Sequence, residues 1–152
     1  VVVDLPLLVS NLTGCKPEDW RNQDSTVAQS VLKALVTSIV QQSPGAKKGS
    51  TAPYAWSDLL VLEVGKAQPR SLANAFLDAV PWRDAKQDLR VSAMARMAEY
   101  MRRLDEMYGT PDEAGGSAYR GVSSAPEPLP GGLPPKSPVP GNIAAAVDAL
   151  WV

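Results

Sequence analysis

Two adjacent lysines, Lys47 and Lys48, are the residues of this sequence whose type and spacing best suit a chemical role. Glycines flank the pair, the hydroxyl residues Ser50 and Thr51 follow it, and no acidic residue lies between positions 24 and 58. Ammonium groups, glycines that permit close approach, and hydroxyl donors together favour contact with phosphate. The spacing does not match a Walker phosphate loop. A solvated surface turn explains the same residues without any ligand.

Aromatic residues follow this lysine loop. Tyr54 and Trp56 come directly after it, and Trp82 lies further on. Basic residues beside aromatic rings are typical of surfaces on which single-stranded bases stack. Packing of these rings in the core around the start of a strand is the alternative.

A second polar and aromatic cluster consists of Arg70, Asn74 and Phe76. Arg70 directly precedes residues 71–80, a segment whose pattern is ambiguous between extended and helical structure and which contains Asn74 and Phe76. We expect these three residues to have a structural role in turns and core, and no catalytic one.

The composition argues against an enzyme. The sequence has no histidine, which removes the commonest general base and the commonest metal ligand. Its single cysteine, Cys15, can form neither an internal disulfide nor a thiolate metal cluster. No pair of acidic residues lies in an evident apolar pocket. We therefore predict no catalytic residue, no metal site and no cofactor.

Length, charge and hydropathy set further bounds. The 152 residues fit one ordinary domain, and the net charge of −1 provides no global field for nucleic acid or membrane binding. No apolar run is long enough to cross a bilayer, and a lone cysteine suits the reducing cytoplasm. Val1 begins an apolar run without an initiator Met, so we expect a chain cut from a longer protein.

Periodicity predicts two long helices. The first spans residues 25–42, with capping-box spacing of Thr26 and Gln29, and the second spans residues 84–108. Each has one predicted apolar face. These faces consist of Ala28, Val31, Leu32, Leu35, Val36 and Ile39 in the first helix, and of Met94, Met97, Met101, Leu104 and Tyr108 in the second. On the opposite side of the second helix, Glu99 with Arg103 and Arg102 with Glu106 have the spacing of ion pairs.

Strands are fewer. Residues 59–64 are almost continuously apolar and predict a strand buried on both faces, and residues 1–3 have the profile of a strand end. A short helix capped by Asp4 should follow residues 1–3, and residues 16–24 should be irregular. Because two strands are too few for an independently stable sheet, either the helices pack alone or chain that is not present completes the sheet.

Composition divides the chain into three parts. Residues 1–108 carry the predicted helices and strands. Residues 109–141 are rich in Pro, Gly, Ser and Ala without an apolar period, which predicts a linker or extended tail. Residues 142–152 can form a short terminal helix.

Several of these segments together resemble one family. They are the Pro-Gly-Ala-Lys loop at 44–47 with its small-residue continuation, the strand at 59–64, and Ser-Leu-Ala-Asn-Ala-Phe at 71–76. A Tyr-Gly step at 108–109 and a terminal Trp-Val agree with the same pattern. The order resembles the C-terminal half of the backbone subunit of type I-E CRISPR surveillance complexes, the CasC family of Cascade. Lys48 departs from it where members can carry Gln, and the Pro/Gly-rich tail follows no family pattern.

The resemblance implies an α+β fold: part of an RRM-like, or ferredoxin-like, palm with two long helices and an extended tail. It implies a non-catalytic scaffold that binds crRNA and lines up with other copies of itself and other Cascade subunits. Target DNA would be met through the guide, and nuclease activity would belong to a recruited partner. Lys47 would contact phosphate with Lys48, Ser50 and Thr51 as neighbours. Asn74 and Phe76 would be structural or lie at the subunit contact.

A protein-interaction module that binds no nucleic acid is the other function that the sequence leaves open. Its helices and proline-rich tail would bind a partner protein. RNA affinity that depends on salt and on Lys47 would separate the two functions. The sequence does not specify the number of copies, the guide nucleotides held or the role of the tail.

Overall fold

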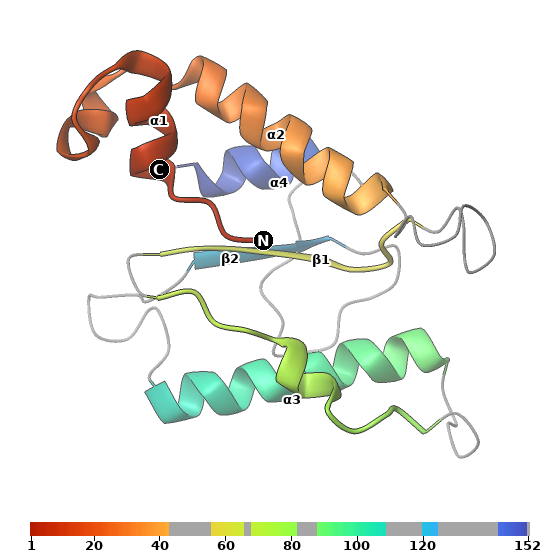
Figure 1. Cartoon of the computed structure of the whole chain (residues 1–152). Helices are drawn as coiled ribbons and strands as arrows, with labels where there is room; N and C mark the ends of the chain where they lie inside the picture. Colours follow the sequence, from red (N-terminus) through yellow and green to blue (C-terminus); the bar gives the residue numbers. More distant parts are fainter. Residues whose placement is uncertain (43–55, 66–67, 82–87, 109–119, 125–142, 152) are drawn as a thin grey trace. The chain divides into compact units, whose positions relative to one another are not determined.

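The chain divides into two compact units in a computed structural model (Figure 1). The first contains residues 1–56 together with Trp151, and the second contains residues 57–150. The structure describes residues 1–42, 56–65, 68–81, 88–108, 120–124 and 143–151.

Helix α1 (Leu5–Thr13) begins and ends where its sequence dictates. The side chain of Asp4 accepts a hydrogen bond of 2.9 Å from the backbone N–H of Leu7, which satisfies one of the free donors of the first turn. Gly14 ends the helix at φ 75°, and its N–H donates to the carbonyl of Ser10 at 2.8 Å. The predicted short helix with its aspartate cap is therefore confirmed.

A short 3-10 helix, η1 (Pro17–Asn22), follows α1. The prediction of irregular structure here was wrong. Proline in the first turn and the need to bury an aromatic ring favour a turn of helix instead. Trp20 is 8% exposed, and the guanidinium of Arg21 lies 4.7 Å from the centre of its ring.

Helix α2 (Thr26–Gln41) lies within one residue of the predicted bounds at each end. The helix does not begin with the predicted capping box of Thr26 and Gln29. The side chain of Asp24 caps its first turn instead. Asp24 accepts hydrogen bonds from the backbone N–H of Thr26 at 2.9 Å and from its hydroxyl at 2.6 Å. Gln29 donates to the hydroxyl of Ser25 at 3.1 Å.

The apolar surface of α2 is divided into a buried and an exposed stripe. The buried stripe consists of Ala28, Val36 and Val40, with Leu32 half-buried. The exposed stripe consists of Val27, Val31, Leu35 and Ile39, which are 38–59% exposed. The predicted single apolar face is therefore only partly buried, since Val31, Leu35 and Ile39 are exposed.

One cluster of buried residues in the first unit consists of Val9, Trp20 and Ala28. One comes from α1, one from η1 and one from α2. The half-buried side chains of Leu5, Leu8 and Trp151 pack against this cluster.

The second unit contains an antiparallel pair of strands, β1 (Leu60–Val64) and β2 (Arg120–Ser124), with Leu62 opposite Val122. The predicted strand at 59–64 is therefore present. Its predicted burial on both faces is wrong, because all five residues of β1 are half-buried. A sheet with two strands among the described residues leaves the outer edges of both strands unpaired there.

Strand β2 was not predicted, because it lies inside the segment 109–141 that was interpreted as a linker. Its sequence, Arg-Gly-Val-Ser-Ser, has one β-branched apolar residue and little intrinsic strand preference. Pairing with β1 makes it a strand. Residues 1–3, predicted as a strand end, form no strand in the structure.

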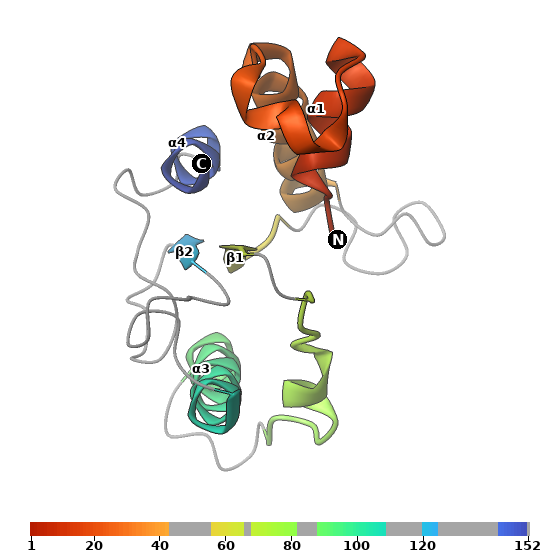
Figure 2. The same ribbon diagram turned by 90° about the vertical axis from the view of Figure 1, so that its left-hand side faces the viewer.

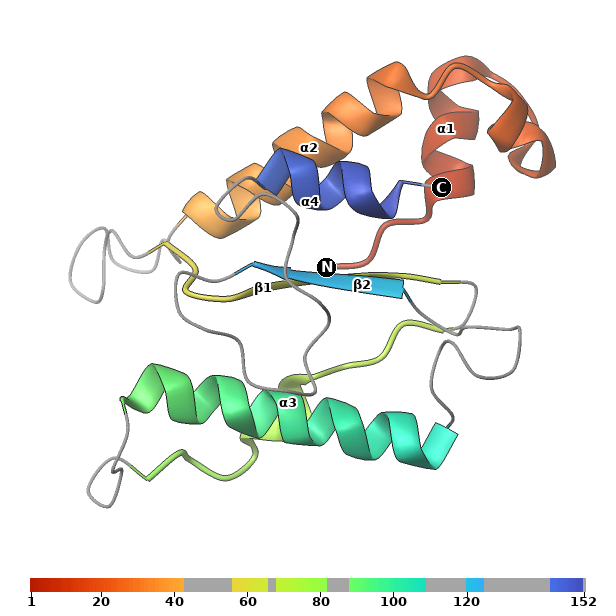
Figure 3. The same ribbon diagram turned by 180° about the vertical axis from the view of Figure 1, so that it is seen from behind.

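Helices lie on both sides of this pair of strands (Figures 2 and 3). On one side, Ala146 and Leu150 of α4 (Ile143–Leu150) pack against Leu62 and Val64 of β1. On the other side lie the long helix α3 (Leu89–Tyr108) and the short 3-10 helix η2 (Ala73–Phe76). The predicted terminal helix is thus present, and the combination of helices with an antiparallel pair of strands agrees with the α+β class.

Helix α3 was predicted from residue 84, but residues 84–87 lie outside the described residues. Met94 and Met101 are buried as predicted, together with Ala98. Tyr108 was assigned to the same apolar face and is 75% exposed, so this part of the prediction was wrong. It is the last residue of the helix, where the buried stripe has ended.

Candidate functional site

The four residues predicted to contact RNA phosphates, Lys47, Lys48, Ser50 and Thr51, lie outside the described residues. Their predicted role stays a prediction. Gln42 is the last described residue before this loop, and its N–H donates to the backbone carbonyl of Ser38 at 2.9 Å.

Trp56 is the first described residue after the lysine loop. Trp56 is 69% exposed. For this residue, the alternative prediction that the aromatic residues after the loop pack in the core is therefore wrong. An exposed indole has a free face on which a base can stack. Tyr54 and Trp82 lie outside the described residues.

The best-defined polar site of the second unit is centred on Arg70. Its Nε and one terminal nitrogen donate to the two carboxylate oxygens of Glu63 at 3.1 and 2.5 Å, and its other terminal nitrogen donates to Asp105 at 2.7 Å. The three side chains are 14%, 16% and 23% exposed in the order Arg70, Glu63, Asp105. Arg70 therefore links β1 to α3 and fixes the segment that precedes η2.

Alternation along β1 explains this geometry. Leu62 and Val64 face α4, so Glu63 between them points to the opposite side, where α3 lies. A carboxylate there requires a cation, and Arg70 supplies one in the two-pronged geometry that a guanidinium favours.

Burial by itself would lower the pKa of Arg70, but hydrogen bonds from its side chain to Glu63 and Asp105, and their charges, raise it overall. The guanidinium thus stays charged at any pH at which the protein folds. Among the described contacts, two carboxylates thus accept from one guanidinium. A phosphate approaching Arg70 would have to displace a carboxylate, so the contacts of Arg70 suit a structural role better than RNA binding.

Asn74 and Phe76 belong to η2, next to Arg70 in the sequence. Ala75 between them is buried at 8% exposure, whereas Asn74 is exposed and Phe76 is 44% exposed. The following residue, Leu77, is 81% exposed and was not singled out in the sequence. The segment therefore presents Phe76 and Leu77 at the surface. A contact with another copy of the chain stays a prediction.

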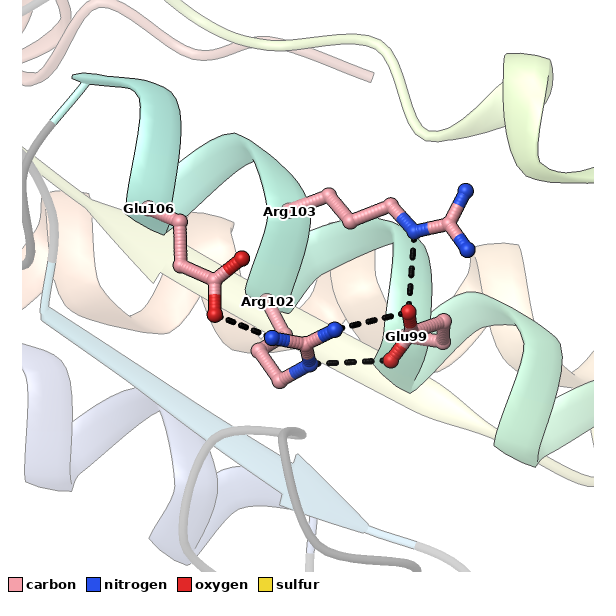
Figure 4. A network of polar contacts seen from close by, with 4 residues as sticks. All are labelled: Glu99, Arg102, Arg103 and Glu106. Carbon is pink, nitrogen blue, oxygen red and sulfur yellow. Dashed lines mark hydrogen bonds and ion pairs between the residues drawn. The ribbon is translucent and has the colours of Figure 1, made fainter.

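Charged residues on the exposed face of α3 form a network of their own (Figure 4). Glu99 accepts hydrogen bonds from Arg102 at 2.9 and 2.8 Å and from Arg103 at 2.8 Å, and Arg102 also pairs with Glu106. The predicted pairs are therefore confirmed. Hydrogen bonds from Arg102, and then from Arg103, lower the pKa of Glu99 to about 2. The four charges balance, so this exposed network is not a basic patch.

Two further features bear on the kind of site. Within the described part of the chain, no group of three or more His, Cys, Asp or Glu residues is placed to hold a metal ion. No helix among these residues is both long enough and apolar enough to cross a membrane.

The comparison with protein families is decisive for classification. The family model described as CT1975-like protein matches residues 1–128, which is most of the sequence. The chain belongs to the CT1975-like family.

Two solved structures with the same fold as this CT1975-like chain have titles that name CRISPR complexes. A chain of a structure titled "CRISPR RNA-guided surveillance complex" is 22% identical and superposes with a TM-score of 0.65 over 89% of this sequence. A second, titled "CRISPR RNA-guided surveillance complex, pre-nicking", is 23% identical with a TM-score of 0.63 over 84%. The match covers only 49% and 36% of those two chains. No curated protein sequence matches.

Proposed function

We propose that this CT1975-like chain is a non-catalytic part of the RNA-binding backbone subunit of a CRISPR surveillance complex. The observation that carries the proposal is the shared fold over 89% of the sequence with a chain of an RNA-guided surveillance complex. The sequence motifs favour the C-terminal half of the type I-E, CasC-like subunit. Its partners would be crRNA, target DNA paired to that guide, neighbouring copies and other Cascade subunits in the cytoplasm.

The two strands would belong to an RRM-like palm. RRM sheets usually read RNA through aromatic residues on an open face. Neither β1 nor β2 contains an aromatic residue, and Leu62 and Val64 of β1 are covered by α4. The palm would therefore act as a support, and contact with RNA would come from loops.

The lysine loop has the chemistry for such a contact. Lys47 and Lys48 would meet backbone phosphates, with Ser50 and Thr51 as hydroxyl donors. The exposed indole of Trp56, a few residues further on, would stack on a base. Recognition of this kind is independent of sequence, as a scaffold for many different guides requires.

The test is a fluorescence-anisotropy titration of labelled single-stranded RNA at several salt concentrations. We expect Lys47→Ala/Lys48→Ala to weaken binding and to reduce the salt slope by about 1.4, the value for two lost phosphate contacts on a single strand. Lys47→Arg/Lys48→Arg keeps both charges and should bind as the parent does. Lys16→Ala removes an exposed cation elsewhere and should have no effect.

RNA binding by the parent that none of these changes alters would contradict the role of the loop. No RNA binding even at low salt would contradict RNA binding by this chain.

Binding of a protein partner is the second candidate function. The observation that favours it is the exposed stripe of α2, four apolar side chains on a helix whose only charged residue is Lys33. A partner held there would bind in high salt and would be lost on Leu35→Asp, with the RNA titration unchanged. Loss of RNA binding in Leu35→Asp with a folded chain would contradict this separation.

A further inference from the structure

Trp151 contributes to the core of the first unit, although it lies far from the other members of that core in the sequence. It packs against the buried cluster of Val9, Trp20 and Ala28. The preceding residue, Leu150, is 7% exposed and belongs to the other unit, where it packs with α4 against β1. Two consecutive residues thus take part in two separate cores.

The part of the first unit around Trp151 consists of short elements. Helix α1 has nine residues and η1 has six, lengths at which isolated helices are marginal in water. The buried cluster next to α1 consists of Val9, Trp20 and Ala28, of which Trp20 is the largest. An indole can bury about 150–250 Å². Trp151 therefore adds an aromatic contact to the small cluster that α1, η1 and α2 share.

We infer that Trp151 is an anchor that holds α1 and η1 in their folded arrangement. When the indole is docked, Leu5 and Leu8 share the cluster with it. When it leaves, Val9, Trp20 and Ala28 lose an apolar neighbour and gain contact with water. The order of the first helices thus depends on a residue that follows α4. This inference is independent of any RNA binding.

The ring of Trp20 also has a charged neighbour. The guanidinium of Arg21 lies 4.7 Å from the centre of the Trp20 ring. Trp151 packs against the cluster that contains Trp20.

Hydrogen–deuterium exchange of the full chain, read by mass spectrometry for each helix, tests the anchor. In Trp151→Ala we expect exchange in α1 and η1 to become faster by on the order of tenfold, with α3 unchanged. Trp151→Phe keeps an aromatic ring and should lie between the parent and the alanine variant. Trp56→Ala removes an indole that is 69% exposed and is the matched control, so its α1 should exchange as in the parent.

Two results would overturn the inference. One is exchange in α1 and η1 that is the same in Trp151→Ala as in the parent. The other is an equal acceleration in α1 and α3, because Trp151 would then support the whole chain and not these two helices. If Trp151→Ala does not fold, the milder Trp151→Phe is compared with the parent. Exchange in α1 and η1 that is the same in these two proteins would then overturn the inference.

Discussion

Glu63 and Arg70 form a two-pronged ion pair, with the Nε and one terminal nitrogen of Arg70 at 3.1 and 2.5 Å from the two carboxylate oxygens. A third donor of the same guanidinium reaches Asp105, 35 positions later in the sequence. One side chain thus joins a strand, a loop and a helix. All three groups are mostly buried and have lost most of their hydration. Their ion pairs offset the free-energy cost of that loss.

Removing Arg70 should destabilise the second unit. Arg70→Ala leaves two partly buried carboxylates without their cation, and we expect a loss of about 2–3 kcal/mol in the free energy of unfolding. Arg70→Lys keeps the charge but not the fork, so it should lose about 1 kcal/mol. Urea denaturation followed by circular dichroism measures both. Arg90→Ala is the control, because Arg90 is 49% exposed and its ion pairs are solvated. If Arg90→Ala lowered the free energy of unfolding as much as Arg70→Ala, burial of the Arg70 ion pairs would not be the cause of the loss.

Burial of the α3 methionines predicts a second contrast. Met101 is 1% exposed, whereas Met107 on the same helix is 73% exposed. We expect Met101→Ala to lower the free energy of unfolding by about 3 kcal/mol through lost burial and a cavity. Met107→Ala should change it by less than about 0.5 kcal/mol. Denaturation midpoints of the two variants that coincide would contradict the placement of this helix.

The pKa of Glu99 predicts how stability depends on acid. Its folded value of about 2 lies below the ordinary value of 4.5, because Arg102 and Arg103 donate to the carboxylate. A lowered folded pKa stabilises the folded state above the ordinary value, and this contribution is lost as the pH falls from 4.5 towards about 2.

The measurement is the urea midpoint of the parent and of Glu99→Gln across this pH range. The parent should be the more stable near pH 6, and the difference should shrink towards pH 2 and in high salt. Glu18→Gln, on an exposed residue of η1, is the control and should show no such trend. A difference between parent and Glu99→Gln that stays constant with pH would contradict the contribution of the network.

Local sequence determined the ends of α1 and the ion pairs along α3. The aspartate before α1 and the glycine after it have the types that cap helices, and the structure uses both. The charged pairs of α3 were predicted from a spacing of four residues and are present. These features could be predicted because a helix places residues three and four apart side by side whatever surrounds it.

Tertiary structure decided the sheet, the Arg70 site and the core of the first unit. Strand β2 has a weak strand sequence and forms because β1 lies beside it. The stripe that α2 buries could not be chosen from its wide apolar surface, since that choice depends on which side chains pack against it. The partners of Arg70 and the position of Trp151 likewise depend on residues far away in the sequence. Sequence periodicity cannot predict such contacts, because they form only when folding brings distant segments of the chain together.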